Sequence, residues 1–326
     1  MRLTRLFGCG VRTRNASLAI ALASPVVVWL ASLAVEALRR APKAPDLMPW
    51  DAELQPAYVN VLEARLRYVK AGSGPVLVLL HTLRTQLDLF HKVIPDLARH
   101  YTVYALDLPG HGYSDSPEGA YDANFFVRHV EGFLEALDLT RVTLAGVSIG
   151  ASIALIIAAR HNPRVVRIIP INPYDYDRGK GMARASRPIR LVMRVSDIPV
   201  VGETVMRLRN YLIMRSVLAG GVSDRRAIAP AMMRELYRVG NRRGQYRGFL
   251  SLLRHSASWE RARSEYGNIT VPTLMIWGAH DWSLPDERQY DESLVPGVRS
   301  VTVAEGGHFL PLDRPGEVIA LIQSAA

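Results

Sequence analysis

The sequence predicts an α/β fold in which a mostly parallel β-sheet is covered by helices. The apolar run Val142–Val147 passes through one serine into the small-residue helical run Ala151–Ala159, which is typical of a buried strand followed by a packed helix. Two further apolar runs, Val271–Gly278 and Val298–Ala304, each lead into a polar loop. With 326 residues and 49% hydrophobic content, the chain can bury the core of one large domain with an insertion.

Ser148 lies in Gly146-Val147-Ser148-Ile149-Gly150, where the first predicted strand becomes a helix. A serine on so sharp a turn has a strained backbone, and the residues two places to either side must be small for the chain to pass. The turn presents the hydroxyl above the sheet and directs the amide of Ile149, at a helix N-terminus, towards a developing oxyanion. In this context the motif predicts that Ser148 is a nucleophile.

A serine hydroxyl needs a base that removes its proton, and the base works best when a carboxylate fixes its tautomer. Asp281 follows the predicted strand Val271–Gly278, and His308 follows the predicted strand Val298–Ala304. Loops at the carboxyl ends of parallel strands open onto one crevice, so we expect Asp281 and His308 to meet Ser148 there. The order serine, aspartate, histidine along the chain is the one expected for this type of sheet.

Two other segments complete the set of motifs, namely His81 after the strand Val76–Leu80 and the glycine-punctuated turn Asp107–Ser114. Together with Gly278–Asp281, Gly307-His308 and the serine turn, they resemble the α/β-hydrolase family. That family holds esterases, lipases, C–C bond hydrolases, epoxide hydrolases and haloalkane dehalogenases. The resemblance runs from about residue 57 to the C-terminus, apart from a middle insertion.

The resemblance implies a mostly parallel eight-stranded sheet with a helical cap between strands 6 and 7. It implies that Ser148 is the nucleophile, His308 the general base and Asp281 the orienting acid. A serine at the turn favours the esterase, lipase and C–C hydrolase branch, because the epoxide hydrolases and dehalogenases open an alkyl carbon with a carboxylate.

The chain departs from the family beside the expected oxyanion hole. The family usually has His-Gly after the third strand, with the next amide completing the hole, whereas this chain has His81-Thr82-Leu83. Glycine allows close approach of the backbone to a substrate, and Thr82 brings in a β-branched side chain. Three readings stay open: the Leu83 amide keeps its place beside that of Ile149, the Thr82 hydroxyl itself donates, or the hole is impaired. We favour a working hole.

Other ionisable residues near these motifs have competing interpretations. Asp175 and Asp177 follow the strand Val165–Ile171 and could replace Asp281 as the acid, but they also suit a solvated turn after Asn172-Pro173. We expect the remaining candidates to be structural or simply exposed: His81, Asp107, His111 and His280.

About a hundred residues separate the strand Val165–Ile171 from the one near Val271. Within them, Arg187–Tyr211 and Ala227–Leu253 show helical spacing of apolar residues, which predicts a cap over the crevice. We therefore divide the chain into a basic N-terminal segment with a membrane anchor (1–45), the first part of the core (46–173), the cap (174–266) and the second part of the core (267–326).

The N-terminal segment predicts a single-pass membrane anchor. Ala16–Val35 is free of charge, and its twenty residues suffice to span a ~30 Å hydrocarbon core as a helix. The alternative is a cleaved signal peptide and a secreted or periplasmic protein, since Ala21-Leu22-Ala23 and Ser32-Leu33-Ala34 have small residues at suitable places. The flanking basic residues weakly favour a catalytic domain on the non-cytoplasmic side.

Charge is unevenly distributed along the chain. The segment Arg178–Arg263 has a net charge of +14 and the first 44 residues have +6, whereas the whole chain has +10. A basic cap suggests attraction to anionic lipid headgroups or to an anionic acyl substrate, unless its arginines merely coat solvated helix faces. No nucleic-acid-binding motif accompanies the charge, and no spacing indicates a metal or a cofactor. Cys9 is the single cysteine, so no disulfide can form within the chain.

These observations predict a serine hydrolase that cleaves an ester with an apolar acyl group through an acyl-enzyme. The same triad would also serve a C–C bond hydrolase or a perhydrolase that resembles the cofactor-free haloperoxidases. A third hypothesis is a ligand-binding protein that keeps the fold without catalysis, for which Thr82 is the indication.

Overall fold

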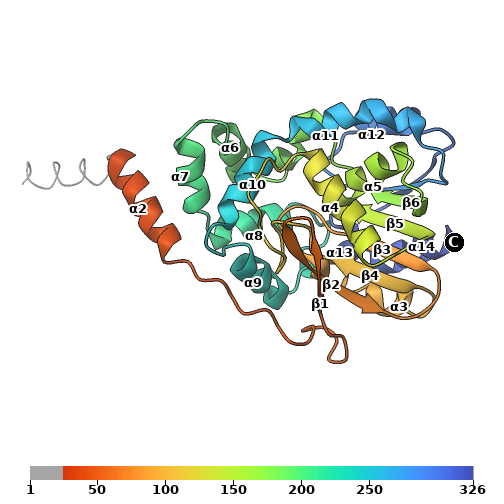
Figure 1. The fold of residues 1–326 in the computed structure, drawn as a ribbon. Helices are drawn as coiled ribbons and strands as arrows, with labels where there is room; N and C mark the ends of the chain where they lie inside the picture. The colour runs from red at the N-terminus through yellow and green to blue at the C-terminus, as the bar shows by residue number, and fades with distance from the viewer. Residues whose placement is uncertain (1–24, 326) are drawn as a thin grey trace, which may run out of the picture.

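The computed structural model describes residues 25–325 and has an eight-stranded sheet at its centre (Figure 1). The strand order is β1-β2-β4-β3-β5-β6-β7-β8. The pairs β1–β2 and β2–β4 are antiparallel and all other neighbours are parallel, so the predicted mostly parallel sheet is confirmed. The strands are β1 Ala57–Val61, β2 Ala64–Ala71, β3 Val76–Leu80, β4 Thr102–Leu106, β5 Val142–Val147, β6 Val165–Ile171, β7 Leu274–Gly278 and β8 Arg299–Val303.

The central strands carry the apolar runs that the sequence shows. Every residue of β5 is buried, as expected for a parallel strand covered on both faces. The strands predicted at Val76–Leu80 and Val165–Ile171 have those bounds in the structure. The strand predicted from Val271 begins only at Leu274, because the intervening proline cannot donate a ladder hydrogen bond.

Helices cover both faces of the sheet (Figure 1). One face carries α4, α5 and α12, and the other carries α3, α13 and α14. The side chain of Asp122 begins α4 by accepting a hydrogen bond from the Phe125 N–H at 2.8 Å. The bounds are η1 Leu87–Phe90, α3 Ile94–Leu97, α4 Ala123–Ala136, α5 Ile149–Ala159, α12 Pro285–Leu294, α13 Leu310–Asp313 and α14 Pro315–Ser324.

The chain between β6 and β7 is helical and lies at one end of the sheet (Figure 1). Each of the two stretches with helical spacing of apolar residues forms more than one helix. The first is broken before α7, at Pro199, and the second between α9 and α10, where Gly244 takes a left-handed φ of 84°. The elements are η2 Asp177–Gly179, η3 Gly181–Arg184, α6 Arg187–Val195, α7 Val201–Arg207, α8 Tyr211–Ala219, η4 Arg225–Ala227, α9 Pro230–Val239, α10 Gln245–Arg254, α11 Ala257–Ala262 and η5 Arg263–Asn268.

The prediction of a membrane-spanning helix over 16–35 is wrong, because none of the helices within residues 25–325 is long and apolar enough to cross a membrane. The described part of that segment belongs to α2, Pro25–Ala37, which lies beside α7 (Figure 1). The end of α2 is fixed to the helical segment between β6 and β7, called the cap below, by a buried carboxylate: Glu36 accepts hydrogen bonds from Arg209 and from the Gly244 amide, each at 2.7 Å. The single-pass localisation that rested on this span is wrong as well, and residues 16–24 lie outside the described part.

Candidate active site

The serine turn has the strained geometry that the sequence predicts. Ser148 joins β5 to α5 with a φ of 59° and a ψ of −118°, a conformation that costs a non-glycine residue about 1–3 kcal/mol. A side chain on Gly146 would overlap the backbone of Gly150, and one on Gly150 would overlap the carbonyl of Leu80. The two glycines are therefore sterically required, and they bring the start of α5 against the end of β3.

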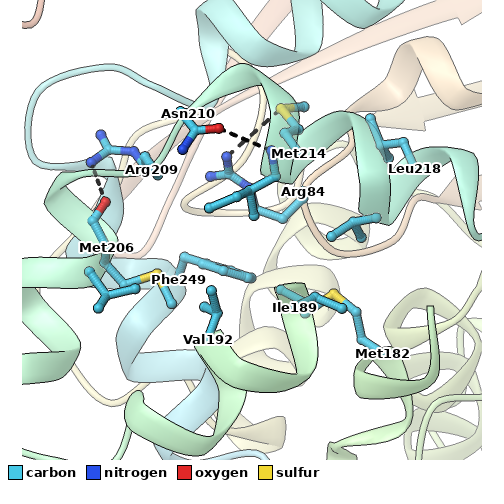
Figure 2. A pocket seen from close by; sticks show the side chains of 13 residues that line it. Arg84, Met182, Ile189, Val192, Met206, Arg209, Asn210, Met214, Leu218 and Phe249 are labelled. Atoms are coloured by element: carbon cyan, nitrogen blue, oxygen red, sulfur yellow. Dashed lines mark hydrogen bonds between the residues drawn. The ribbon is translucent and has the colours of Figure 1, made fainter. Parts of the chain in front are cut away.

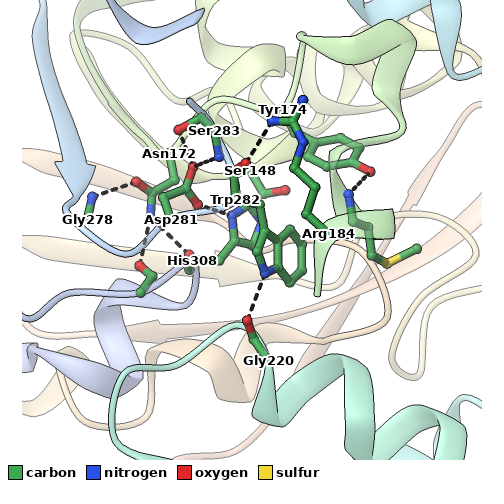
Figure 3. Close-up of polar contacts among 12 residues, drawn as sticks. Ser148, Asn172, Tyr174, Arg184, Gly220, Gly278, Asp281, Trp282, Ser283 and His308 are labelled. Carbon is green, nitrogen blue, oxygen red and sulfur yellow. Dashed lines mark hydrogen bonds and ion pairs between the residues drawn. The ribbon is translucent and has the colours of Figure 1, made fainter. Parts of the chain in front are cut away.

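Asp281 and His308 meet at the ends of β7 and β8, as the sequence predicts. The Asp281 Oδ1 lies 2.5 Å from the His308 Nδ1, and both side chains are fully buried (Figure 3). The other carboxylate oxygen accepts hydrogen bonds from the amide and the hydroxyl of Ser283, at 2.9 and 2.5 Å. Burial alone would raise the pKa of Asp281, but the charge of His308 and these hydrogen bonds hold that pKa below its ordinary value. An ionised Asp281 accepts from Nδ1–H and leaves the lone pair on Nε2.

The Ser148 Oγ and the His308 Nε2 are both buried, and neither has a hydrogen-bond partner within residues 25–325. They are thus the two groups of the expected triad that no protein partner satisfies. A hydrogen bond between nucleophile and base is often long in a free enzyme and tightens only when substrate is present. Ser148 is 1% exposed, so a substrate reaches it only after a cap or loop segment moves.

Asn172 joins the loops after β6, β7 and β8, a role that the sequence analysis missed. It follows β6, whose last residue accepts a hydrogen bond from the Ser148 amide at 2.9 Å. The buried Asn172 amide donates to the carbonyls of Gly307 and His308 at 3.0 and 3.1 Å, and its oxygen accepts from the Gly278 N–H at 2.7 Å (Figure 3). One side chain therefore fixes the positions of three loops at the carboxyl edge of the sheet. A polar residue directly after an apolar strand was the available signal.

Trp282 was not predicted as a site residue, yet it stacks on the catalytic candidate His308. Their ring centroids are 3.9 Å apart and the planes differ by 16°. The indole N–H donates to the carbonyl of Gly220 at 2.8 Å, and the Trp282 carbonyl accepts from Arg184 at 2.8 Å (Figure 3). Because Gly220 and Arg184 belong to the segment between β6 and β7, the imidazole is packed against a ring that the cap holds.

The loop after β3 is held by His81, as expected for a structural histidine. Its Nδ1–H donates to the Thr82 carbonyl at 2.8 Å, and its Nε2 accepts from the Leu108 N–H at 2.9 Å. Burial lowers the pKa of His81 to about 4, so the ring is neutral at neutral pH. The N–H groups of Leu83 and Ile149 donate to no acceptor within residues 25–325, as an oxyanion hole requires.

A buried ion pair beside this loop also holds it in place. Arg67, on β2, is fully buried with its Nε 2.6 Å from Asp107 and a terminal nitrogen 3.3 Å from Asp88. Asp107 also accepts hydrogen bonds from the amides of Leu87 and Tyr113 at 2.8 and 2.7 Å. The Asp107 motif is therefore scaffold, as predicted, but its partner Arg67 was not foreseen because an arginine on a strand usually faces water.

Asp175, the rival for the acid, belongs to a different cluster. It is fully buried, so the solvated turn expected there is wrong for this residue. Its carboxylate accepts from the Tyr266 hydroxyl at 2.6 Å and lies 3.8 Å from Arg263, which also pairs with Asp291. Burial raises the pKa of both carboxyls, and the charge of Arg263 opposes the rise. Within the described residues, Asp281 and not Asp175 is the carboxylate that is hydrogen-bonded to the Nδ1 of His308.

Three known proteins are similar to this chain in sequence or in fold. An uncharacterized protein of Mycobacterium tuberculosis is 26% identical over 267 residues, which cover 78% of this chain and 75% of that protein. Epoxide hydrolase 3 of Xenopus tropicalis is 23% identical over 305 residues, covering 86% of this chain and 80% of that protein. The crystal structure of Cfl2 from Burkholderia cenocepacia shares the fold with a TM-score of 0.73 and 22% identity, over 88% of this chain and 98% of that one.

The family described as alpha/beta hydrolase fold matches residues 75–315, from the start of β3 to the start of α14. The match includes the serine turn, the Asp281–His308 pair and the helical segment between β6 and β7. The chain belongs to the alpha/beta hydrolase fold family.

Proposed function

We propose that the protein is a serine hydrolase that cleaves a carboxylic ester with an apolar acyl group through an acyl-enzyme. The observation that carries the proposal is the orientation of His308. Its Nδ1 is hydrogen-bonded to a buried, ionised Asp281. Its Nε2 and the Ser148 hydroxyl, both without a partner within residues 25–325, lie in loops at the same carboxyl edge of the sheet. An imidazole held in this way can act as a general base.

In the proposed reaction, His308 Nε2 removes the proton of Ser148 as Oγ attacks the ester carbonyl carbon. The carbonyl oxygen becomes an oxyanion, which the N–H groups of Leu83 and Ile149 stabilise. His308 then gives the proton to the leaving alkoxide, and the C–O bond of the ester breaks. Water repeats the sequence on the acyl-enzyme, with Asp281 stabilising the imidazolium that forms in each half.

The serine at the turn supports acyl chemistry over two other activities of the family. Opening an epoxide or a haloalkane carbon needs a carboxylate nucleophile at this position, and this chain has Ser148 there. Asp281, the carboxylate that does reach the site, is bonded to His308 and Ser283.

A chamber in the cap supports an apolar acyl group (Figure 2). The cavity is narrow, with a volume of about 50 Å³ that is open to water-sized groups. It lies between the loop after β3 and the cap helices, because Arg84, the residue after Leu83, forms part of its wall. Its apolar wall residues are Met182, Ile189, Val192, Val205, Met206, Ile213, Met214, Val217, Leu218 and Phe249.

The test is labelling with a fluorophosphonate, which reacts with activated serines, together with turnover of 4-nitrophenyl esters of increasing acyl length. We expect labelling at Ser148 and turnover that Ser148→Ala abolishes. The matched control Ser293→Ala, on the exposed side of α12, should keep both. A folded wild-type protein that is neither labelled nor active would contradict the proposal and favour a ligand-binding role.

A further inference from the structure

Arg84 is a partly buried guanidinium that lacks a carboxylate partner within residues 25–325. It donates to the carbonyl of Gly240 at 2.9 Å and lies 3.9 Å from the sulfur of Met214. Its guanidinium carbon is 5.1 Å from the centre of the Phe249 ring. All three contacts are neutral, so they leave the positive charge of Arg84 without compensation.

Four arginines of the cap are paired with carboxylates, whereas the half-buried Arg207 and Arg242 contact only neutral groups within residues 25–325. Arg184 pairs with Glu287, Arg209 with Glu36, Arg254 with Glu203 and Arg263 with Asp291, each with a nitrogen within 2.8 Å of a carboxylate oxygen. Charges removed from water are normally paired, because desolvation of an isolated charge is costly. Arg84 also lacks a carboxylate, and of these three arginines it is the one that lies in the wall of the chamber, where a ligand can supply the missing charge.

The surroundings of Arg84 strengthen its positive field. Arg209 and Arg39 lie near it, and the two share one carboxylate, Glu36, at 2.7 and 3.1 Å. Burial, with the charges of Arg209 and Arg39, lowers the pKa of Arg84 to about 9, so the side chain is still a cation at neutral pH. Glu36 therefore pairs with Arg209 and Arg39 and does not compensate the charge of Arg84.

Arg84 is also placed to act on a substrate. It follows Leu83, whose amide is the expected oxyanion donor, and its side chain lies in the wall of the apolar chamber (Figure 2). A molecule whose ester group lies at the oxyanion loop and whose chain fills the chamber would bring a distal group towards the guanidinium. Guanidinium and carboxylate form strong, charge-assisted hydrogen bonds that fix orientation.

We propose that Arg84 binds the free carboxylate of a half-ester, so that the preferred substrates are monoesters of aliphatic dicarboxylic acids. The methylene chain lies against the apolar wall, and the anionic end is paired with Arg84. This inference rests on the proposed serine hydrolase activity, and it narrows the substrate from an apolar acyl ester to one that is apolar along its chain and anionic at its end.

The experiment compares two matched substrates, 4-nitrophenyl hydrogen suberate and 4-nitrophenyl methyl suberate, which differ in one negative charge. We expect the wild type to have the higher kcat/KM for the half-ester, and Arg84→Met to reduce the ratio of the two kcat/KM values by about 10- to 100-fold. Arg84→Lys should keep part of the preference. The control Arg194→Met removes an equal charge from the exposed side of α6 and should leave the ratio unchanged.

Binding of the suberate dianion to Ser148→Ala, followed by calorimetry, separates this inference from the proposed catalysis. Binding that Arg84→Met weakens at least tenfold and Arg194→Met does not would support the anion site even if the wild type cleaved no ester. A wild type that labels with fluorophosphonate but prefers the neutral diester, or an Arg84→Met variant with the wild-type ratio, would overturn the inference and leave the hydrolase proposal intact.

Discussion

Replacing Asn172 by alanine should lower both stability and turnover, because this residue fixes the loops that carry the site. The change removes three buried hydrogen bonds, to the carbonyls of Gly307 and His308 and from the Gly278 N–H. At about 1 kcal/mol for each net hydrogen bond, the free energy of unfolding should fall by about 3 kcal/mol. For a chain of 326 residues, that corresponds to a decrease in Tm of roughly 4 °C.

Turnover should fall by a separate route. With its carbonyl anchor lost, His308 is less firmly held relative to Ser148, and a small misplacement of a catalytic group costs on the order of 100-fold in rate. We therefore expect kcat for a 4-nitrophenyl ester to drop by about 10- to 100-fold at a temperature where the variant is fully folded. Thermal unfolding by circular dichroism and the rate of fluorophosphonate labelling measure the two effects independently.

The control is Asn162→Ala, at the opposite end of β6. Asn162 donates to Glu131 at 3.1 Å and accepts from the Arg164 N–H at 3.0 Å, so its removal should lower Tm without changing kcat. If Asn172→Ala kept wild-type kcat and labelling rate while losing stability as Asn162→Ala does, the positioning role of Asn172 would be refuted.

Three further changes test other parts of the site. Asp281→Asn should lower kcat by about 10⁴-fold, as expected when the imidazole loses its orienting carboxylate. The charge of His308 and the Ser283 hydrogen bonds lower the pKa of Asp281, so its stabilising contribution is complete above the ordinary carboxyl pKa of about 3.9 and disappears as the pH falls through the lowered value. The difference in Tm between wild type and variant should therefore shrink in acid. Thr82→Val should change kcat by less than about threefold if the Leu83 amide forms the oxyanion hole, whereas a loss of about 100-fold or more would assign the donor to the Thr82 hydroxyl. Arg184→Met removes the paired contacts to Glu287 at 2.7 and 2.9 Å and the bond to the Trp282 carbonyl, so it should cost at most about 1 kcal/mol of stability and speed the labelling of Ser148 by loosening the cap; an unchanged labelling rate would show that access does not depend on this contact.

Local signals in the sequence were sufficient for the main features of the site. The glycines around Ser148 are dictated by close backbone contacts within the turn, and such contacts depend on neighbours in the chain. The polar loops after β7 and β8 could be located because each follows an apolar strand, and parallel strands end at one edge. The contact between Asp281 and His308 was therefore predictable, although 26 residues lie between them.

The prediction of a membrane-spanning helix was wrong because a long apolar run can also form a helix that packs against the protein, as α2 does against α7. The run gave no sign that Glu36, just after it, would be buried against Arg209 of the cap. A burial partner more than a hundred residues away leaves no local signature. Asp175 is a similar case, because its buried partners Arg263 and Tyr266 come from the far end of the cap.

The sequence by itself determined the fold class, the serine turn and the order of the three expected catalytic residues, because strand periodicity and the steric demands of a tight turn act over a few neighbouring residues. Only the tertiary structure decided what surrounds them: the Asn172 bonds, the Trp282 ring on His308, the Arg67–Asp107 pair and the unneutralised Arg84. Those features depend on which distant segments pack together, and hence on burial and charge that no single stretch of the chain specifies.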